Sequence, residues 1–387
     1  MTIVKFIKPL YTIYYWVGSF VLNIIKFIVK PEDNLILFIS FGGKKYDDSP
    51  MMIYEEMIKD DRFDNYKLVW AFHNPKDFVI PRGRMIKTDS LEYYITALKA
   101  RCWVTNSRVE RGLSFKGRNT FYFNTWHGTP IKKMGKDISN NNKSFGSKAK
   151  WNVDIMTAQS KYEADIFSRV FNIERERFLV CGLPRNDNLA TATKETKQTI
   201  MSKIGLPLDK KVILYAPTFR EYERDKKFNC VIAPPIDFEE WEKKIGDEYI
   251  ILLRVHYEVA KVLNVKVNNS FVYNVSDYPI LNDLMIASDM LISDYSSIYF
   301  DYSILERPML CYAYDYEKYI EKRGMYFDIR KFFLGGTTEE ELLDVIKDFS
   351  YEENLRLVRK FRNNYVENYG SATSVSIETI YKNIKMK

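Results

Sequence analysis

The sequence predicts an α/β protein with two doubly wound, Rossmann-like domains facing a cleft, preceded by an amphipathic membrane helix. Three observations lead to this prediction. Short apolar runs alternate with longer amphipathic ones, which is the pattern of parallel sheets covered by helices. The chain has 387 residues, which is long for one domain and enough for two. Its first thirty residues are apolar and aromatic apart from a few lysines and small polar residues.

Composition narrows the class of protein. The chain is 46% hydrophobic and 28% charged, as expected for a globular protein, and its formal charge of +7 suits anionic partners. Lysine and arginine are dispersed without an aromatic-interleaved basic stripe, so nucleic acid is not an expected partner. With three histidines and no paired cysteine spacing, we expect no zinc site. No carboxylate cluster suggests another bound metal, so no cofactor is expected; a metal held only through a bound ligand is the alternative. Cys102, Cys181 and Cys311 lie in apolar runs, which predicts reduced, buried thiols.

Residues 1–30 are predicted to form a helix that lies in the membrane interface. At 100° per residue, the polar side chains fall within a stripe about 60° wide. A transmembrane helix and a helix docked on the protein itself remain alternatives. We expect a peripheral protein of the cell membrane. The members of the stripe are Lys5, Lys8, Thr12, Ser19, Asn23, Lys26 and Lys30.

The first domain is expected over residues 31–188. β-Branched and aromatic residues predict its strands, and amphipathic spacing predicts its helices. The strands are 34–40, 66–72, 103–106, 120–125, 153–158 and 178–181, and the helices are 50–62, 90–101 and 160–171.

The second domain is expected over residues 189–387. A polar, Thr- and Lys-rich stretch at 189–207 marks the junction. The predicted strands are 212–217, 249–256, 271–274, 290–293 and 309–314, and the predicted helices are 237–245, 280–287, 298–305, 339–350 and 352–368.

The motif NTWHGTPI at 124–131 is the first candidate for chemistry. It follows a predicted strand, where ligands collect in sheets of this kind. Gly128 and Pro130 favour a turn that presents His127, and an imidazole suits a general base near neutral pH. A core histidine packed beside Trp126 is the alternative.

Two other motifs end strands of the second domain. In LRVH at 253–256, Arg254 and His256 share one strand face and could both point at a phosphate; a structural arginine with a surface histidine is the alternative. In YAPTFR at 215–220, Thr218 and Arg220 are candidate diphosphate ligands, or part of a solvated loop. The remaining histidine, His73, is interpreted as structural.

The fourth motif, ISDYSSI at 292–298, leads from a strand into a helix. Asp294, Ser296 and Ser297 are typical helix-capping residues, and the free N–H groups of such a helix start bind phosphate. A cap without a ligand is the common alternative.

Taken in order, these motifs resemble the CDP-glycerol:poly(glycerophosphate) glycerophosphotransferase family of teichoic-acid synthesis. The resemblance rests on TWHGTP at 125–130, YAPTFR at 215–220, LRVH at 253–256 and SDYSSIYFDYSILERP at 293–308. The segments FGGK at 41–44 and RGMYFD at 323–328 add to it. The match covers roughly residues 35–370. One departure is Tyr257, because the family usually has proline after the second histidine.

The resemblance implies a GT-B-like fold, membrane attachment and a CDP-glycerol donor. Because this donor is a cytosolic nucleotide, we expect the protein at the cytoplasmic face of the cell membrane. The resemblance also implies that His127 is the general base and that His256 is a second essential group near the transferred phosphate. The acceptor would be an undecaprenyl-diphosphate-linked disaccharide or a primed teichoic acid chain. The expected substrate-binding residues are Gly128, Thr129, Thr218, Arg220, Arg254, Asp294, Ser296, Ser297 and Arg323.

Chain length then predicts a member that primes the linkage unit or extends it briefly, because the long polymerases carry an additional N-terminal domain. Transfer of ribitol phosphate from CDP-ribitol, polymerisation, and a UDP-sugar glycosyltransferase or epimerase of the same fold are the alternative enzymes. A catalytically silent membrane-surface binder is the alternative outside enzymology.

Overall fold

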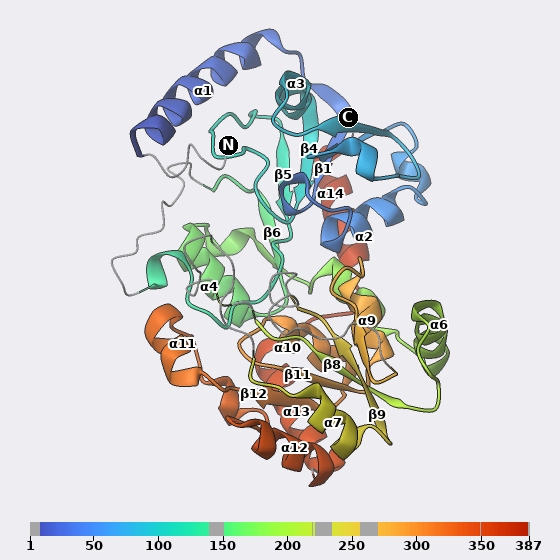
Figure 1. Cartoon of the computed structure of the whole chain (residues 1–387). Coiled ribbons are helices and arrows are strands. Elements are labelled where there is room, and N and C mark those ends of the chain that lie inside the picture. The colour runs from blue at the N-terminus through green and yellow to red at the C-terminus, as the bar shows by residue number, and fades with distance from the viewer. Residues whose placement is uncertain are drawn as a thin grey trace. The chain divides into compact units, whose positions relative to one another are not determined.

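The computed structural model describes residues 8–138, 151–218, 220, 234–255, 270–348 and 350–385. It divides into two compact units, each an α/β domain built on a parallel sheet (Figure 1). The first unit comprises residues 1–127, 135–187 and 368–387, and the second comprises 128–134 and 188–367. The predicted α/β class with two parallel-sheet domains is confirmed.

The first sheet has seven strands in the order β3-β2-β1-β4-β5-β6-β7, all parallel. Its central strands are buried on both faces, which explains their continuous apolar sequences. Strand β3 was not predicted from sequence because its charged ends and short length carry no apolar run. The strands are β1 (Glu32–Ile39), β2 (Lys67–Phe72), β3 (Arg84–Lys87), β4 (Ala100–Thr105), β5 (Phe121–Asn124), β6 (Ile155–Ala158) and β7 (Phe178–Val180).

Serine caps begin two helices of this domain, α3 (Leu91–Lys99) and α4 (Lys161–Phe171). The hydroxyl of Ser90 accepts from Tyr93 N and that of Ser160 from Glu163 N. Helices α2 (Asp48–Met57) and α14 (Ala372–Ile384) complete the domain, and the short α5 (Asp187–Ala190) lies at the passage to the second.

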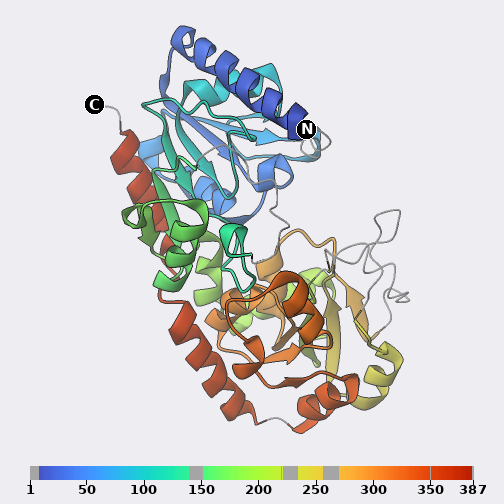
Figure 2. The same ribbon diagram turned by 90° about the vertical axis from the view of Figure 1, so that its left-hand side faces the viewer.

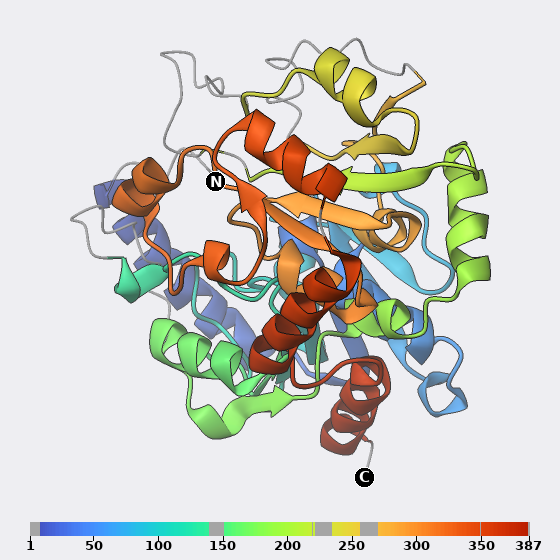
Figure 3. The same cartoon turned by 90° about the horizontal axis from the view of Figure 1, so that it is seen from below.

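The second sheet has six parallel strands in the order β10-β9-β8-β11-β12-β13 (Figure 3). Trp241 and Leu342 are buried in the core that covers it. The strands are β8 (Lys211–Tyr215), β9 (Tyr249–Leu253), β10 (Val272–Asn274), β11 (Met290–Ser293), β12 (Met309–Tyr312) and β13 (Gly335–Gly336). The helices are α6 (Lys194–Ile204), α7 (Phe238–Ile245), α9 (Leu281–Ala287), α10 (Ile298–Tyr302), α11 (Tyr316–Arg323), α12 (Glu339–Asp348) and α13 (Tyr351–Tyr365).

The last helix, α14, belongs to the first domain, whereas the sequence placed all of 189–387 in the second (Figure 2). Ile377, Ile380 and Ile384 line one face of α14 and are buried in the core beneath the first sheet. No helix was predicted beyond residue 368. The apolar stripe of α14 is present in the sequence, but nothing local indicates which sheet it covers.

Helix α1 (Lys8–Ile28) lies against the first domain through its polar side. Ser114 N donates to Ser19 Oγ (3.0 Å), Asn23 Nδ2 donates to the Ser114 carbonyl (2.7 Å), and the Tyr11 hydroxyl donates to the Gly112 carbonyl (3.4 Å). Ser19 and Asn23 of the predicted polar stripe therefore face the protein itself. Both side chains satisfy backbone groups of a loop that would otherwise lack partners. Lys5 lies outside the described residues.

The outward side of α1 is apolar and open to solvent. Trp16, Phe20 and Phe27 are 64%, 67% and 88% exposed, and Ile13, Val17 and Ile24 share this side. Within the described residues, Leu10–Ile28 is the one helix long and apolar enough to cross a membrane. An exposed apolar face of this size marks an interaction surface.

The cysteine prediction is confirmed for Cys102, Cys181 and Cys311, which are free and buried. Burial raises the pKa of each thiol, so these residues act as small apolar side chains.

Candidate active site

The carboxyl edge of the first sheet carries unusual backbone conformations. Its strand order reverses between β1 and β4, which is where ligands bind in open α/β sheets. Non-glycine residues with positive φ follow β1 (Phe41, 45°, and Asp48 at the start of α2, 67°), β4 (Arg111, 54°) and β5 (Trp126, 49°). Such conformations are costly and gather at functional sites, so this edge is the candidate active site of the first domain.

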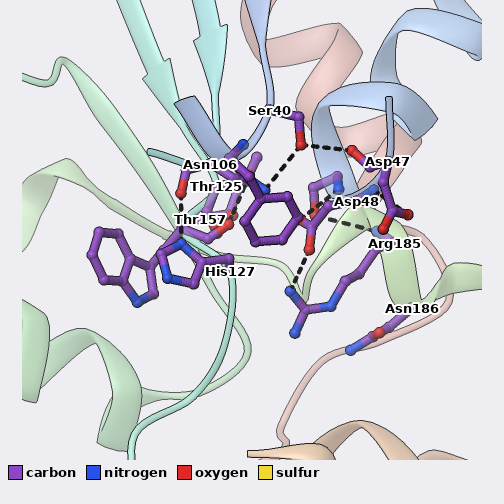
Figure 4. Close-up of polar contacts among 12 residues, drawn as sticks. Ser40, Asp47, Asp48, Asn106, Thr125, His127, Thr157, Arg185 and Asn186 are labelled. Atoms are coloured by element: carbon purple, nitrogen blue, oxygen red, sulfur yellow. Dashed lines mark hydrogen bonds and ion pairs between the residues drawn. The ribbon is translucent and has the colours of Figure 1, made fainter. Parts of the chain in front are cut away.

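Asn106, the first residue after β4, ties these loops together. Its side-chain oxygen accepts from Phe41 N (2.8 Å), and its Nδ2 donates to Ser40 Oγ (3.3 Å). Ser40 Oγ in turn donates to the Asp47 carbonyl (2.9 Å; Figure 4). The loop after β1 is therefore fixed to the loop after β4.

The turn before His127 is set by Asn124, the last residue of β5. Its side-chain oxygen accepts from Trp126 N (2.8 Å) and its Nδ2 donates to the Ser107 carbonyl (2.6 Å). This asparagine turn holds Trp126 in its left-handed conformation and directs the next side chain away from the strand. The indole of Trp126 then stacks on the imidazole, with ring centroids 4.2 Å apart.

One hydrogen bond fixes the tautomer of His127. Its Nδ1 lies 2.8 Å from the carbonyl oxygen of Asn106 (Figure 4). A carbonyl can only accept, so Nδ1 carries the proton and Nε2 of the neutral ring has a free lone pair. The imidazole is thus prepared to accept a proton at Nε2.

Burial lowers the pKa of His127 below its usual value, opposed by the hydrogen bond to Asn106. The side chain keeps an exposed surface, so its apolar surroundings disfavour the charge without closing the ring off from reactants. The ring is therefore neutral at pH 7.

An ion pair near His127 was not predicted from sequence. Asp48 Oδ2 lies 2.9 Å from Arg185 Nη1, and both charges act on the imidazole. Asp48 follows β1 and Arg185 follows β7, so only the fold brings them together. The signals available in sequence were the acidic pair before a predicted helix and the Leu-Pro-Arg-Asn stretch after a predicted strand.

In the second domain, the end of the NTWHGTPI motif and the residues that follow it form main-chain hydrogen bonds with the RGMYFD segment at 323–328. Lys133 N donates to the Gly324 carbonyl (3.1 Å), and Tyr326 N donates to the Ile131 carbonyl (2.8 Å). Thr129, two residues before the first of these hydrogen-bonded residues, is buried. Arg323 ends α11 immediately before it, and its buried Nε has no hydrogen-bond partner among the residues that the structure describes.

Gly128 packs directly against Ser297. A Cβ at position 128 would lie 2.9 Å from Ser297 Oγ, so a larger residue at position 128 would displace that hydroxyl. Ser296 Oγ accepts from Ile298 N at 3.3 Å, at the start of α10. The structure therefore brings Gly128 together with the serine pair of the ISDYSSI motif.

Thr218 and Asp294 meet where the order of the second sheet reverses, between β8 and β11. Asp294 Oδ1 accepts from Thr218 N (2.8 Å) and from Tyr295 N (2.6 Å). Within the described part of the chain, the buried hydroxyl of Thr218 has no hydrogen-bond partner. Asp294 thus organises two loops through their backbones, and its Oδ2 faces Arg220 at 2.9 Å as an ion pair.

Arg220 is buried, with 1% of its side chain exposed, and is held by two carboxylates. Nε and Nη2 donate to Asp315 at 2.7 and 2.8 Å, and Nη1 donates to the Thr218 carbonyl at 2.6 Å. Tyr295 and Tyr319 lie against the guanidinium, 5.0 and 5.1 Å from their ring centroids. Asp315 follows β12, and the sequence did not suggest it as a partner of Arg220.

Arg254 donates from Nη1 to the carbonyls of Val275 (2.9 Å) and Tyr278. It thereby supports the loop after β10. His256 lies outside the described residues. His73 Nδ1 lies 2.7 Å from Thr88 Oγ1, which agrees with a structural role.

The family model of CDP-Glycerol:Poly(glycerophosphate) glycerophosphotransferase matches residues 21–384. The chain belongs to this family. The resemblance predicted from the ordered motifs is confirmed.

The relatives within this glycerophosphotransferase family include proteins named as transferases and proteins named as polymerases. The teichoic acid glycerol-phosphate transferase of Staphylococcus aureus is 35% identical over 84% of this chain and 86% of the relative. The teichoic acid poly(glycerol phosphate) polymerase of Staphylococcus epidermidis is 38% identical over 78% of this chain, which spans only 43% of that protein. The polymerase of Bacillus spizizenii is 34% identical over 87% of this chain and 89% of its own length. Chain length therefore does not separate transferases from polymerases, contrary to our expectation.

Solved structures agree with the assignment to the glycerophosphotransferases. The wall teichoic acid polymerase TagF superposes with a TM-score of 0.85 at 34% identity, covering 94% of this chain and 92% of that one. A UDP-GlcNAc 2-epimerase from Neisseria meningitidis gives 0.53 at 14% identity, over 90% of this chain and all of its own, and shows the fold alone. The GT-B-like fold is confirmed.

Proposed function

We propose that this glycerophosphotransferase moves glycerol phosphate from CDP-glycerol to a hydroxyl of an undecaprenyl-diphosphate-linked teichoic acid precursor and releases CMP. The family and its glycerol-phosphate relatives support this donor. So does the structure of a TagF variant solved after a soak with CDPG, with a TM-score of 0.82 at 34% identity over 92% of this chain and 90% of that one.

The observation that carries the proposal is the fixed tautomer of His127. Nε2 accepts the proton of the acceptor hydroxyl, whose oxygen attacks the glycerol-bearing phosphorus. A new P–O bond forms while the bond to the CMP oxygen breaks, and CMP leaves with that electron pair. A neutral ring with Nε2 unprotonated is the form that this step requires.

The donor diphosphate is proposed to bind in the second domain, at the carboxyl edge of its sheet. Thr218, Ser296 and Ser297 supply hydroxyl and backbone donors near the reversal of the second sheet. Donors that meet the developing charge lower the barrier most when they are already in place. Gly128, Thr129, Arg254, His256, Asp294 and Arg323 complete the proposed set.

Arg220 is proposed to act on the donor indirectly, through the residues that it holds in place. Its guanidinium is engaged by Asp294 and Asp315 and covered by tyrosines, so it orients Asp294 and the Thr218 loop instead of contacting the diphosphate itself.

The test uses purified full-length enzyme with CDP-glycerol and a synthetic lipid-linked disaccharide. We expect CMP release together with a gain of one or a few glycerol phosphate units per lipid by mass spectrometry. A long ladder would indicate polymerisation. CMP release with CDP-ribitol but not with CDP-glycerol would overturn the choice of donor.

We also propose that α1 binds the cytoplasmic membrane surface through its outward apolar side. The docked polar side leaves Trp16 and Phe20 exposed, as expected for a helix immersed in the interface.

Replacing both Trp16 and Phe20 with glutamate is expected to lower binding to vesicles of anionic lipid at least tenfold, because charged side chains oppose insertion. The melting temperature stays unchanged, since neither side chain is buried. Co-sedimentation measures the binding. Glutamate at Tyr351, which is 52% exposed in the second domain, is the control; an equal loss there would contradict the proposed surface.

A further inference from the structure

A buried ion pair in the first domain bears on His127, and the role inferred for it rests on the proposed function. Asp48 and Arg185 lie 2.9 Å apart, with side-chain exposures of only 6% and 11%. Together they join the start of α2 to the turn after β7. Exposed ion pairs contribute little, whereas a pair this well covered keeps its geometry and its field.

The backbone of Asp48 is held in a costly conformation. Its φ of 67° lies in the left-handed region, which non-glycine residues rarely adopt. The Asp47 side chain accepts from Asp48 N (2.7 Å), and Asp48 Oδ1 accepts from Ser49 N (2.7 Å). Arg185 N also donates to Ser49 Oγ (3.3 Å). A carboxylate fixed from several sides at a strained position points to a functional role.

The two charges act on the imidazole of His127 in opposite directions. Asp48 favours its protonated form and Arg185 disfavours it. Figure 4 shows the pair at the same edge of the sheet as the ring. Three uncharged groups pack on the ring itself: the indole of Trp126, the ring of Phe41 and the carbonyl of Asn106.

We propose that Asp48 is a positioning residue of the transfer reaction, whose carboxylate stabilises the imidazolium that His127 becomes when Nε2 takes the acceptor's proton. The proton stays on Nε2 until CMP has left and then passes to solvent. Asp48 exchanges no proton.

Arg185 has the complementary role. It keeps the Asp48 carboxylate oriented through the short ion pair. Its positive charge also offsets Asp48 in the resting enzyme, so the ring remains neutral and able to accept a proton. Removal of either partner therefore unbalances the field at His127, with opposite signs.

The experiment measures kcat/KM for CMP release against pH in four full-length variants. In Asp48→Asn, the midpoint of the acid limb is expected to fall by about half a pH unit, because Arg185 acts unopposed. In Arg185→Gln, it rises by about the same amount. The double variant returns close to the wild-type midpoint. Asp154→Asn removes a charge that pairs with Lys116 at 2.5 Å just before β6 and leaves the midpoint unchanged.

Asparagine keeps the size of Asp48 and tolerates left-handed backbone, so the first variant tests charge alone. Shifts of the same sign in both single variants, or no shift in either, would overturn the proposal. The double variant leaves no buried unpaired charge. If a single variant fails to fold, a double-variant midpoint far from that of wild type would contradict the proposal. Absence of CMP release by wild-type enzyme would instead defeat the proposed function, which separates the two failures.

Discussion

Replacing His127 with alanine is expected to lower the rate of glycerol phosphate transfer about 100- to 10,000-fold, the usual contribution of a general base. The acceptor hydroxyl then has no group at this point to take its proton. The loss should appear in kcat, with little change in the affinity for CDP-glycerol measured by calorimetry. Because burial lowers the pKa of His127, wild-type activity should fall on the acid side with a midpoint below 6.5.

His73→Ala is the matched control for that loss. Its imidazole also carries a hydrogen bond through Nδ1, but to the hydroxyl of Thr88. We expect its activity to remain within about threefold of wild type, a smaller change than removal of a general base causes. Full activity in His127→Ala, with an unchanged melting temperature, would remove the proposed base.

Replacing Arg220 with methionine is expected to lower the free energy of unfolding of the second domain by roughly 3–5 kcal/mol. Methionine fills part of the volume but leaves Asp294 and Asp315 without their shared cation in a buried site. Trp241 is the only tryptophan in the sequence of this domain and lies in its core. With 5-fluorotryptophan incorporated, the ¹⁹F resonance of Trp241 in a urea titration reports this domain separately.

Lys211→Ala is the control for Arg220. Its ion pair with Glu248 is 2.5 Å long but more than half exposed on both sides, so its removal should cost about 0–1 kcal/mol. Equal stability of Arg220→Met and wild type would show that the buried cluster does not hold the Thr218 loop in place.

The sequence predicted the elements whose signal is local. Buried parallel strands such as β1 and β11 are continuous apolar runs and were identified within a few residues. Strands β3 and β13 were missed because one is short with charged ends and the other is a pair of glycines. Helix α6 was missed because its polar, threonine-rich sequence resembles a linker.

Contacts between residues that are distant in the sequence could not be predicted from it. The link between His127 and the Asn106 carbonyl uses a backbone atom, which no residue pattern reveals. The Asp48–Arg185 pair joins residues 137 positions apart. The same limit explains α1, whose polar stripe is plain in the sequence although the loop that it meets is not.

The route of the chain has a consequence for its synthesis. Ile377, Ile380 and Ile384 complete the apolar core that residues 36–123 begin, so this core can close only after residue 384 has been synthesised. A chain that ends before residue 368 would leave the apolar face of the first sheet exposed. Such a chain is prone to bind chaperones or to aggregate. A deletion of residues 368–385 therefore destabilises the first domain, although these residues follow the second domain in the sequence.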